Sequence, residues 1–289
     1  MTEAEARVAA LDRVLTRLAL TTEKNVPKVI EKLLPAVIAE LNLQNNLVLQ
    51  KVIEILSHVN KVLSGQTEIK IPVEALIQVC QGDNASQVTR SYALMYVEKG
   101  FLRETKDVQI ALLGRIFDSA RFFQAQSARL VLFRLALISL GNTGGDKVDP
   151  NVVENFAQKA DFVDFATKFM LYQGPYNRST SGAPPAVSPG LSAENMAQLK
   201  WQDETYENTT QRKVAALKFL SKMEAGVSVE LLLPLLLAAA CDPNDQVSGL
   251  GDQLLRKVRQ LVLTGHHMVI LPHTPCPACP LSRVTQNLI

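Results

Sequence analysis

Leu33-Leu34-Pro35 is the stretch that decides the fold, because the chain carries a second copy of it in the same setting. Thirteen residues after Pro35 stands Val48, and eight residues further stands Leu56. Near the other end the same spacings join Leu232-Leu233-Pro234, Val247 and Leu255, and Ala39 and Ala238 also coincide. A pattern that recurs at one spacing indicates an internal structural repeat.

Each copy consists of two apolar segments on either side of a polar turn, residues 42–46 in one and 242–245 in the other. Two apolar segments joined in this way predict a pair of antiparallel helices. A helical pair that recurs along a chain is typical of an α-solenoid. We therefore predict an all-α fold, an α-solenoid of about five HEAT-like helical hairpins. Such proteins usually act through their surface rather than through a catalytic pocket.

The first hairpin shows the helical period most clearly. Its second helix is expected over 46–63, with one apolar face formed by Val48, Val52, Ile55, Leu56, Val59 and Leu63. Its first helix is expected over 26–41, with Pro35 in its middle. A proline there removes one hydrogen bond and bends the axis, which is typical of the first helix of a HEAT hairpin.

The rest of the chain continues in helices. Further helices are expected over 4–20, 75–79, 88–97, 107–120, 121–140, 150–172, 211–223, 228–240 and 244–263. Residues 192–210 are polar and do not indicate one structure. No segment alternates with period two over a sustained length, so essentially no sheet is expected.

Composition divides the chain into four parts. HEAT-like repeats are expected over 1–173 and again over 193–263. Residues 174–192 hold prolines among glycines and serines, which predicts a flexible loop. Residues 264–289 read as an irregular tail.

Charge and hydropathy exclude several classes of protein. Among 289 residues, 30 are basic and 28 acidic, and they are interspersed, so no nucleic-acid partner is expected. The apolar run 130–140 is too short for a membrane span, which needs about 20 residues. The N-terminus is acidic and polar, unlike a signal peptide. Four cysteines are too few for a disulfide framework, which favours the cytoplasm and nucleus.

Two segments invite a chemical interpretation. Gly141–Gly145 lacks the lysine and hydroxyl residue that a phosphate-binding loop carries after its last glycine, so a linker is expected. Cys276-x-x-Cys279 with His273 could supply zinc ligands, and His266 and His267 lie nearby. Their spacing is unlike that of the usual zinc fingers. A zinc site and an unstructured tail therefore both stay open.

The remaining candidate groups favour ordinary packing. His58 is expected at a surface or between helices, and Cys80 and Cys241 are expected to be buried as small apolar residues. The phenylalanines at 156, 162, 165 and 169 have helical spacing and are expected in the core. No catalytic motif is present. We therefore predict no catalytic residue, no cofactor and no small-molecule substrate.

Several strings, taken in order, resemble a known family. They are Val48-x-x-Lys51-Val52-x-Glu54-x-Leu56-x-His58-x-Asn60-Lys61, Ile69-Lys70-Ile71-Pro72-Val73-Glu74-Ala75-Leu76, Tyr96-Val97-Glu98-Lys99-Gly100-Phe101, Asp164-Phe165-x-x-x-Phe169-Met170-Leu171 and Gly174-Pro175-Tyr176. This order is similar to the N-terminal region of the proteasome adaptor and scaffold family. Members are very large HEAT-repeat proteins that associate with the 26S proteasome. The resemblance runs over about residues 5–263.

The resemblance implies a non-enzymatic scaffold that binds the proteasome core and regulatory particles and supports their assembly or integrity. Exposed candidates for contact are Lys51, Glu54, His58, Asn60 and Lys61. Family members are several times longer, and the tail from Gly265 is unlike the family, which indicates a truncated or alternatively spliced product. The alternative is a generic HEAT adaptor for transport or translation. The proteasome subunit contacted is not indicated.

Overall fold

The computed structural model describes residues 3–22, 24–145, 148–173, 188, 190–200, 205–222 and 227–263. These residues form α-helices and two short 3-10 helices, with no strand among them, which confirms the all-α prediction. The helices are α1 (Glu3–Ala19), α2 (Val26–Ala39), η1 (Glu40–Leu43), α3 (Asn46–Gly65), α4 (Val73–Gln81), α5 (Gln87–Phe101), α6 (Lys106–Ala111), α7 (Leu113–Ser119), η2 (Ala120–Phe122), α8 (Gln126–Thr143), α9 (Pro150–Asn155), α10 (Lys159–Leu171), α11 (Ala193–Leu199), α12 (Tyr206–Lys222), α13 (Val229–Ala240) and α14 (Asp245–Leu263).

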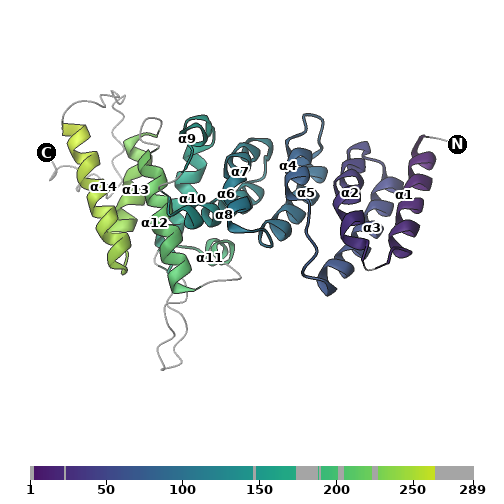
Figure 1. The fold of residues 1–289 in the computed structure, drawn as a ribbon. Helices are drawn as coiled ribbons and strands as arrows, with labels where there is room; N and C mark the ends of the chain where they lie inside the picture. Colours follow the sequence, from purple (N-terminus) through teal and green to yellow (C-terminus); the bar gives the residue numbers. More distant parts are fainter. Residues whose placement is uncertain are drawn as a thin grey trace.

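The helices pair and stack side by side in an elongated row (Figure 1). The pairs in contact are α2–α3, α4–α5, α7–α8, α10–α12 and α13–α14. Neighbouring pairs meet through α2–α4, α4–α7 and α10–α13 on one layer, and through α5–α8, α8–α12 and α12–α14 on the other. Each pair buries its apolar faces against its neighbours, which is the architecture of an α-solenoid. The predicted solenoid is thus confirmed.

The two sequence copies agree better in their second helices than in their first. Val48 of α3 and Val247 of α14 are both fully buried. In the first helices, Leu34 before Pro35 is buried, whereas Leu233 before Pro234 is half-buried and Leu232 is buried instead. The core face of α13 is therefore rotated by about one residue relative to its proline. The turns that connect the two helices of each copy also differ. The turn after α2 contains the 3-10 helix η1, whereas the described turn between α13 and α14 contains none.

A cluster of phenylalanines fills the middle of the stack. The rings of Phe117 and Phe156 lie 4.2 Å apart, and Phe117 stacks on Phe219 at 5.3 Å. Phe133 and Phe162 meet edge to face at 5.4 Å. These residues come from four helices and the α9–α10 junction, so one cluster joins two consecutive pairs, α7–α8 and α10–α12. The prediction that the aromatic residues serve packing is confirmed.

Two helices expected from the sequence are broken. The expected helix 150–172 is wrong as a single rod: α9 ends at Asn155, and Phe156 has an extended backbone before α10 begins at Lys159. The break turns Phe156 inward to the aromatic cluster, and that packing outweighs helical continuity. The expected helix 107–120 is also divided at Leu112, between α6 and α7.

The apolar run predicted to be a buried helix lies inside α8. Its residues Leu132, Phe133 and Leu135 are buried, and Arg129 just before the run pairs with Asp161 of α10 at 2.7 Å. Within the described ranges, no helix combines the length and the apolar character needed to cross a bilayer.

The residues between α10 and α12 return to the body of the molecule. Ser188 Oγ accepts a hydrogen bond from Gln173 N at 2.9 Å, beside the end of α10. The stretch that did not indicate one structure contains α11 and the first turn of α12. Arg134 of α8 donates to the Lys200 carbonyl at 3.2 Å and so holds the end of α11 against α8. The expected flexible loop lies mostly outside the described residues, and the domain boundaries stay a prediction.

Candidate functional site

The five residues predicted as exposed contacts all lie on α3, but they are not equally accessible. Glu54 and Lys61 are exposed, as expected. Lys51, His58 and Asn60 are half-buried. For His58 this agrees with its expected place at a surface or between helices, whereas the expected exposure was wrong for Lys51 and Asn60. These two are engaged in contacts between helices of the stack.

Lys51 joins α3 to α1. Its Nζ lies 2.7 Å from Asp12 Oδ1 on α1 and 2.7 Å from Glu54 Oε2 on α3. The hydrogen bonds to Asp12 and then to Glu54 raise the pKa of Lys51. The charge of this lysine is therefore balanced inside the protein, which leaves Glu54 and Asp12 as the accessible groups.

Asn60 joins α3 to the next hairpin. Its Oδ1 accepts a hydrogen bond from Lys99 Nζ at 3.1 Å, and the same ammonium group lies 5.5 Å from the centre of the Tyr96 ring. Tyr96 is fully buried and donates its hydroxyl to the Leu56 carbonyl at 3.3 Å. Burial raises the pKa of Tyr96. These contacts fix α5 against α3.

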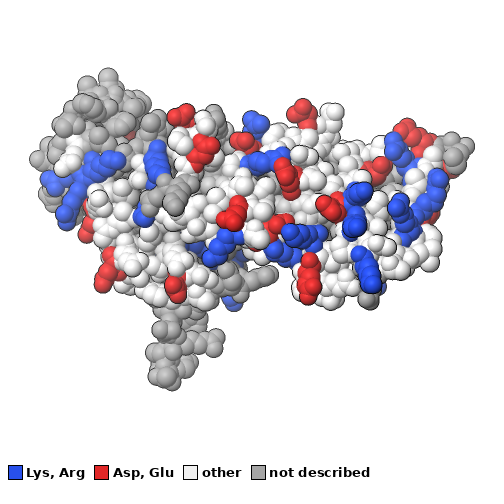
Figure 2. Space-filling model, in the orientation of Figure 1, with Lys and Arg blue, Asp and Glu red and all other residues white. Residues whose placement is uncertain are grey.

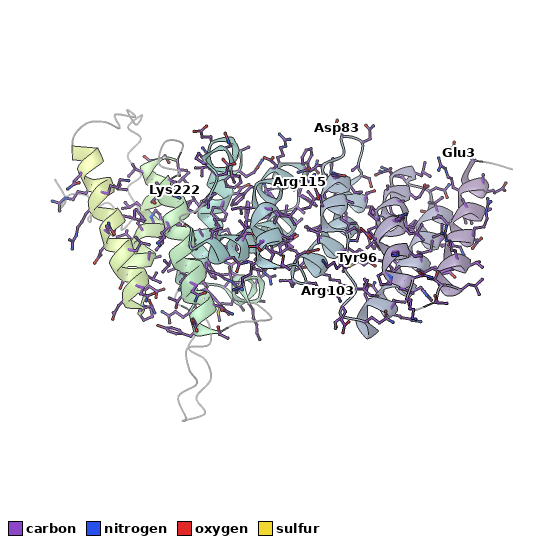
Figure 3. The ribbon with its side chains drawn as sticks, viewed as in Figure 1. Glu3, Asp83, Tyr96, Arg103, Arg115 and Lys222 are labelled. Carbon is purple, nitrogen blue, oxygen red and sulfur yellow. The ribbon has the colours of Figure 1, made fainter. Side chains whose placement is uncertain are left out.

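The connector between α3 and α4 packs on the end of α5. Arg103 donates to the carbonyls of Leu63 and Ile69, at 3.1 and 3.2 Å, and so satisfies acceptors at the C-terminal end of α3. A Cβ atom added to Gly100 would lie 2.6 Å from Val73 Cγ2 and 2.9 Å from Ile71 Cβ. Only glycine allows this close approach. Figure 3 labels Tyr96 on α5 and Arg103 in the turn that follows it.

Three of the five strings that carried the family resemblance thus meet at one place. The α3 string, the Ile69–Leu76 string and the Tyr96–Phe101 string form the junction of the first two hairpins. Most of their characteristic residues therefore serve the stacking of repeats. Around them, Glu54, Lys61 and Lys99 remain exposed for contact with another molecule.

Two shallow grooves flank the N-terminal turn of α3. One, of about 390 Å³, lies between α1 and α3 and is lined by Asp12, Leu47 and Glu54 among others. The other, of about 480 Å³, lies between the end of η1 and the starts of α3 and α5, with Glu40, Leu49 and Val88 in its lining. Leu47 is 57% exposed and Val88 50%. We call this region, the two grooves with Leu47 and Val88, the turn ridge.

The turn ridge is held in place by a side chain of the first turn. Asn42 Oδ1 accepts hydrogen bonds from Ser86 N at 2.9 Å and from Thr89 Oγ1 at 2.7 Å. Gln44 closes η1 with a left-handed backbone, and Asn45 caps α3 by accepting from Leu47 N at 2.9 Å. Apolar side chains are therefore displayed on fixed turns, an arrangement suited to binding a partner protein.

The charges of the visible face are mixed. Figure 2 shows basic and acidic side chains interspersed along the molecule, without one large area of a single sign. The lining of the two grooves is more acidic, with Glu5, Asp12, Glu40 and Glu54 against Lys51. A partner surface that carries basic groups beside an apolar anchor would complement it.

The groups that sequence reasoning considered for chemistry have structural places. Residues 141–143 belong to the last turn of α8, where a linker was expected. Gly144 and Gly145 have positive φ and end the helix, and Gly145 packs against the backbone of Ala215 on α12. Cys80 is buried as predicted, and burial raises the pKa of its thiol to about 12. Cys241 is exposed, and the prediction of its burial was wrong.

Metal ligation was also considered. Among the described residues, no three His, Cys, Asp or Glu side chains gather in a way that would hold a metal ion. The candidate zinc ligands His266, His267, His273, Cys276 and Cys279 lie outside the described residues.

Sequence reasoning missed one buried charge pair. Lys213 Nζ of α12 lies 2.6 Å from Asp242 Oδ2 in the α13–α14 turn and donates to the Met170 carbonyl of α10 at 3.0 Å. Burial lowers the pKa of Lys213, and the hydrogen bond to Asp242 opposes that effect. The sequence does carry a sign of this pair. Lys213 falls on the apolar face of the helical pattern over 209–220, where a lysine is rarely found.

Comparison with known proteins agrees with this arrangement. Over 241 residues, 81% of this chain and 12% of the relative, the chain is 25% identical to the Drosophila melanogaster protein named Proteasome-associated protein ECM29 homolog. Over 103 residues, 35% of this chain and 6% of the relative, it is 32% identical to the Homo sapiens protein named Proteasome adapter and scaffold protein ECM29. The chain thus matches only a small part of each relative's length. No solved structure matches.

The family comparison covers more of the chain. Residues 11–264 match the family described as Proteasome component ECM29, N-terminal. The match extends from within α1 to the end of α14 and so takes in almost the whole described stack. The chain therefore belongs to the family of the N-terminal region of the proteasome component ECM29.

Proposed function

We propose that this chain is a non-enzymatic adaptor that binds the proteasome through its helical-repeat surface, in the cytoplasm and nucleus. The observation that carries the proposal is the family match over residues 11–264, which covers almost the whole described solenoid. The names of its relatives, a proteasome-associated protein and a proteasome adapter and scaffold protein, support the same partner. By holding the core particle and the regulatory particle together, such an adaptor would support the assembly or integrity of the proteasome.

The turn ridge is the surface that we assign to this contact. Leu47 and Val88 stand on fixed turns of two successive hairpins, and Glu40 and Glu54 lie in the adjoining grooves. An apolar anchor on the partner would contact the leucine and valine, and basic groups around that anchor would face the carboxylates. Because each hairpin presents its own turn, the contact extends along the stack rather than into one pocket.

The experiment is a binding assay with purified 26S proteasome, isolated core particle and isolated regulatory particle. We expect the tagged full chain to co-sediment with at least one of them. Leu47→Asp combined with Val88→Asp is expected to weaken binding about tenfold or more, because it removes apolar contact area and adds negative charge.

A matched control is Leu20→Asp combined with Val108→Asp, which adds the same two charges at exposed apolar residues outside the turn ridge. It should bind like the unchanged chain. Absence of binding to all three particles, under low and high salt, would contradict the proteasome proposal. Equal loss in both variants would instead contradict the assignment of the turn ridge. Recovery of transport receptors or ribosomes in place of proteasomes would select the generic HEAT adaptor.

A further inference from the structure

The two grooves of the turn ridge differ in how their carboxylates are paired. In the groove between α1 and α3, Lys51 Nζ lies 2.7 Å from Asp12 Oδ1 and 2.7 Å from Glu54 Oε2, so one ammonium group is held from two sides. In the other groove, Glu40 Oε1 lies 3.3 Å from Arg7 Nη1 of α1. The Arg7 side chain is 49% exposed. The ion pair of the second groove is therefore the easier one to exchange.

This second groove, which we call the η1 groove, combines apolar walls with a single charge. It lies between the end of η1 and the starts of α3 and α5 and has a volume of about 480 Å³. Leu41, Leu49 and Val88 supply apolar lining, and Glu40 is the one charged residue among the described residues that line it. The volume is within the range of sites that hold a small ligand, so one long side chain fits.

A groove of this kind suits the side chain of arginine. The methylene groups of an arginine pack against apolar surface while its charged end reaches a polar group. Its planar guanidinium can also donate two parallel hydrogen bonds to one carboxylate, which the ammonium group of lysine does not do. Glu40 Oε2 accepts no hydrogen bond within the described part of the chain, so this oxygen is open to a second donor.

The chain already places a guanidinium at this carboxylate. Arg7 belongs to α1, which stands at the end of the row of helices, and it reaches Glu40 from outside the hairpin that carries the groove (Figure 1). An ion pair between exposed side chains changes an equilibrium only about 1.5- to 5-fold. A guanidinium from another molecule can therefore replace Arg7, which becomes hydrated instead.

We propose that the η1 groove receives an arginine side chain of the partner protein, and that Arg7 competes with it for Glu40. The proposal rests on the assignment of the turn ridge as a binding surface. It adds which group of the partner enters and which group of the chain gives way. The incoming arginine gains contact with the apolar walls, a contact that the structure does not give to Arg7, and Glu40 stays paired throughout the exchange.

The test uses the full chain and two peptides that differ in one group. Both have the sequence Gly-Ser-Val-X-Leu-Ser-Gly with an N-terminal trifluoroacetyl group, and X is arginine in one and its uncharged isostere citrulline in the other. Titration followed by fluorine NMR gives both dissociation constants, into the millimolar range. We expect the arginine peptide to bind about fivefold or more tightly, because only its side chain is charged and can pair with Glu40.

Variants assign this difference to the two side chains. Glu40→Gln should bind the arginine peptide no more tightly than the citrulline peptide. Arg7→Gln should tighten binding of the arginine peptide about two- to threefold and leave the citrulline peptide unchanged, whereas Arg7→Lys should behave like the unchanged chain. The matched control is Arg13→Gln, which removes the same charge from α1, where Arg13 donates to the Ala9 carbonyl of its own helix. This control should change neither dissociation constant.

Equal binding of the two peptides, or no binding of either at millimolar concentration, would overturn the proposal. Equal effects of Arg7→Gln and Arg13→Gln would do the same, as would an effect of Arg7→Gln that persists when Glu40→Gln is also present. The outcome is separate from that of the proteasome assay. A preference for arginine without binding to any proteasome particle would support this inference and contradict the proteasome proposal, and the reverse pattern would do the opposite.

Discussion

At the scale of single residues, α5 shows how a few side chains fix two repeats. Arg90 donates to the carbonyls of Cys80 and Gly82 at the end of α4, at 3.0 and 2.9 Å. Arg103, in the turn that follows α5, does the same for Leu63 in the last turns of α3 and for Ile69 in the connector after it. Guanidinium groups suit helix C-termini because they both donate hydrogen bonds and oppose the negative end of the helix dipole. Side chains of α5 and of the turn after it thus donate hydrogen bonds at the ends of two other helices.

Gly100 gives a prediction at this scale. Gly100→Ala should lower the free energy of unfolding by about 1–3 kcal/mol, because the new methyl group would overlap Val73 and Ile71. The control is Gly249→Ala in α14, where no atom lies within 4 Å of the added Cβ. There alanine should raise stability by about 0.5–1 kcal/mol through its helix propensity. Urea denaturation measures both, and a neutral Gly100→Ala would show that the connector yields.

Cys80 gives a second prediction. Because its thiol has a pKa of about 12 against an ordinary 9.0, iodoacetamide at pH 8.5 should alkylate Cys80 at least about 100-fold more slowly than exposed Cys241. Peptide mapping by mass spectrometry follows both sites, and the difference should vanish in urea. The same burial opposes ionisation only in the folded state. Its contribution to stability is therefore full below about pH 9 and is lost as the pH rises toward about 12.

Sequence reasoning at the residue scale succeeded where a pattern reports a local property. The apolar face of α3 follows from the helical period of its sequence. It failed for Lys51, Asn60 and Cys241, because exposure of a residue near a helix edge depends on the neighbouring hairpin. Sequence reasoning identified a helix that carries part of the candidate site, α3, but did not identify the surface, the turn ridge. The turn ridge needs the packing of α1, α3 and α5, which no single segment encodes.

At the scale of elements, Lys213 and Asp242 connect three helices that are far apart in sequence. The lysine stands on α12, its carboxylate partner follows α13, and the carbonyl of Met170 at the end of α10 accepts its second hydrogen bond. A buried charge pair is costly to place in the interior, and it stabilises only while every donor and acceptor is satisfied. It therefore favours one register of these helices over others.

Removing one partner should expose that cost. Lys213→Met or Asp242→Leu alone is expected to lower the free energy of unfolding by about 3–5 kcal/mol, because the remaining charge stays buried without its partner. The double variant Lys213→Met with Asp242→Leu should lose clearly less than the sum of the two single variants. Thermal and urea unfolding of all four proteins completes the cycle. Additive losses would show that the pair is not coupled.

The helices that the sequence missed have a common cause. The break at Phe156 and the division at Leu112 both occur where a residue turns into the core, and Phe156 reaches the aromatic cluster. The free energy gained from that packing comes from contacts between segments that are distant in the sequence. Helical period and propensity report only on neighbouring residues, so they do not predict it. The rotation of α13 relative to Pro234 has the same origin, because the shape of the preceding hairpins decides which leucines are covered.

At the scale of the whole molecule, the stability of the stack is approximately the sum of what each hairpin contributes and of the contacts between neighbouring hairpins. Each hairpin touches the next one, and the aromatic cluster joins α7, α8, α10 and α12 in the middle. At one end, α1 packs only against α2 and α3 among its principal contacts. Contact in a repeat protein is transmitted between neighbours, so the ends open more easily than the centre.

Hydrogen exchange should display this gradient. Amides of α8 and α12 are expected to exchange about 100-fold or more slowly than those of α1, because opening the centre disrupts two interfaces and the aromatic cluster. Mass spectrometry of peptic peptides under native conditions gives the comparison. Phe117→Ala should reduce the protection of α8 and α12 while leaving α1 nearly unchanged. Uniform protection throughout would indicate one all-or-none unit instead.

The α10–α12 pair has one more consequence. Its two helices are separated by more than thirty residues, yet Lys213 meets Met170, Ser188 meets Gln173, and α8 packs along α12. Cohesion of the two portions therefore comes from side chains and not from the peptide link between 173 and 188. Two separately produced polypeptides that meet there should recombine into one particle, and new termini or an inserted reporter would be accommodated at that point.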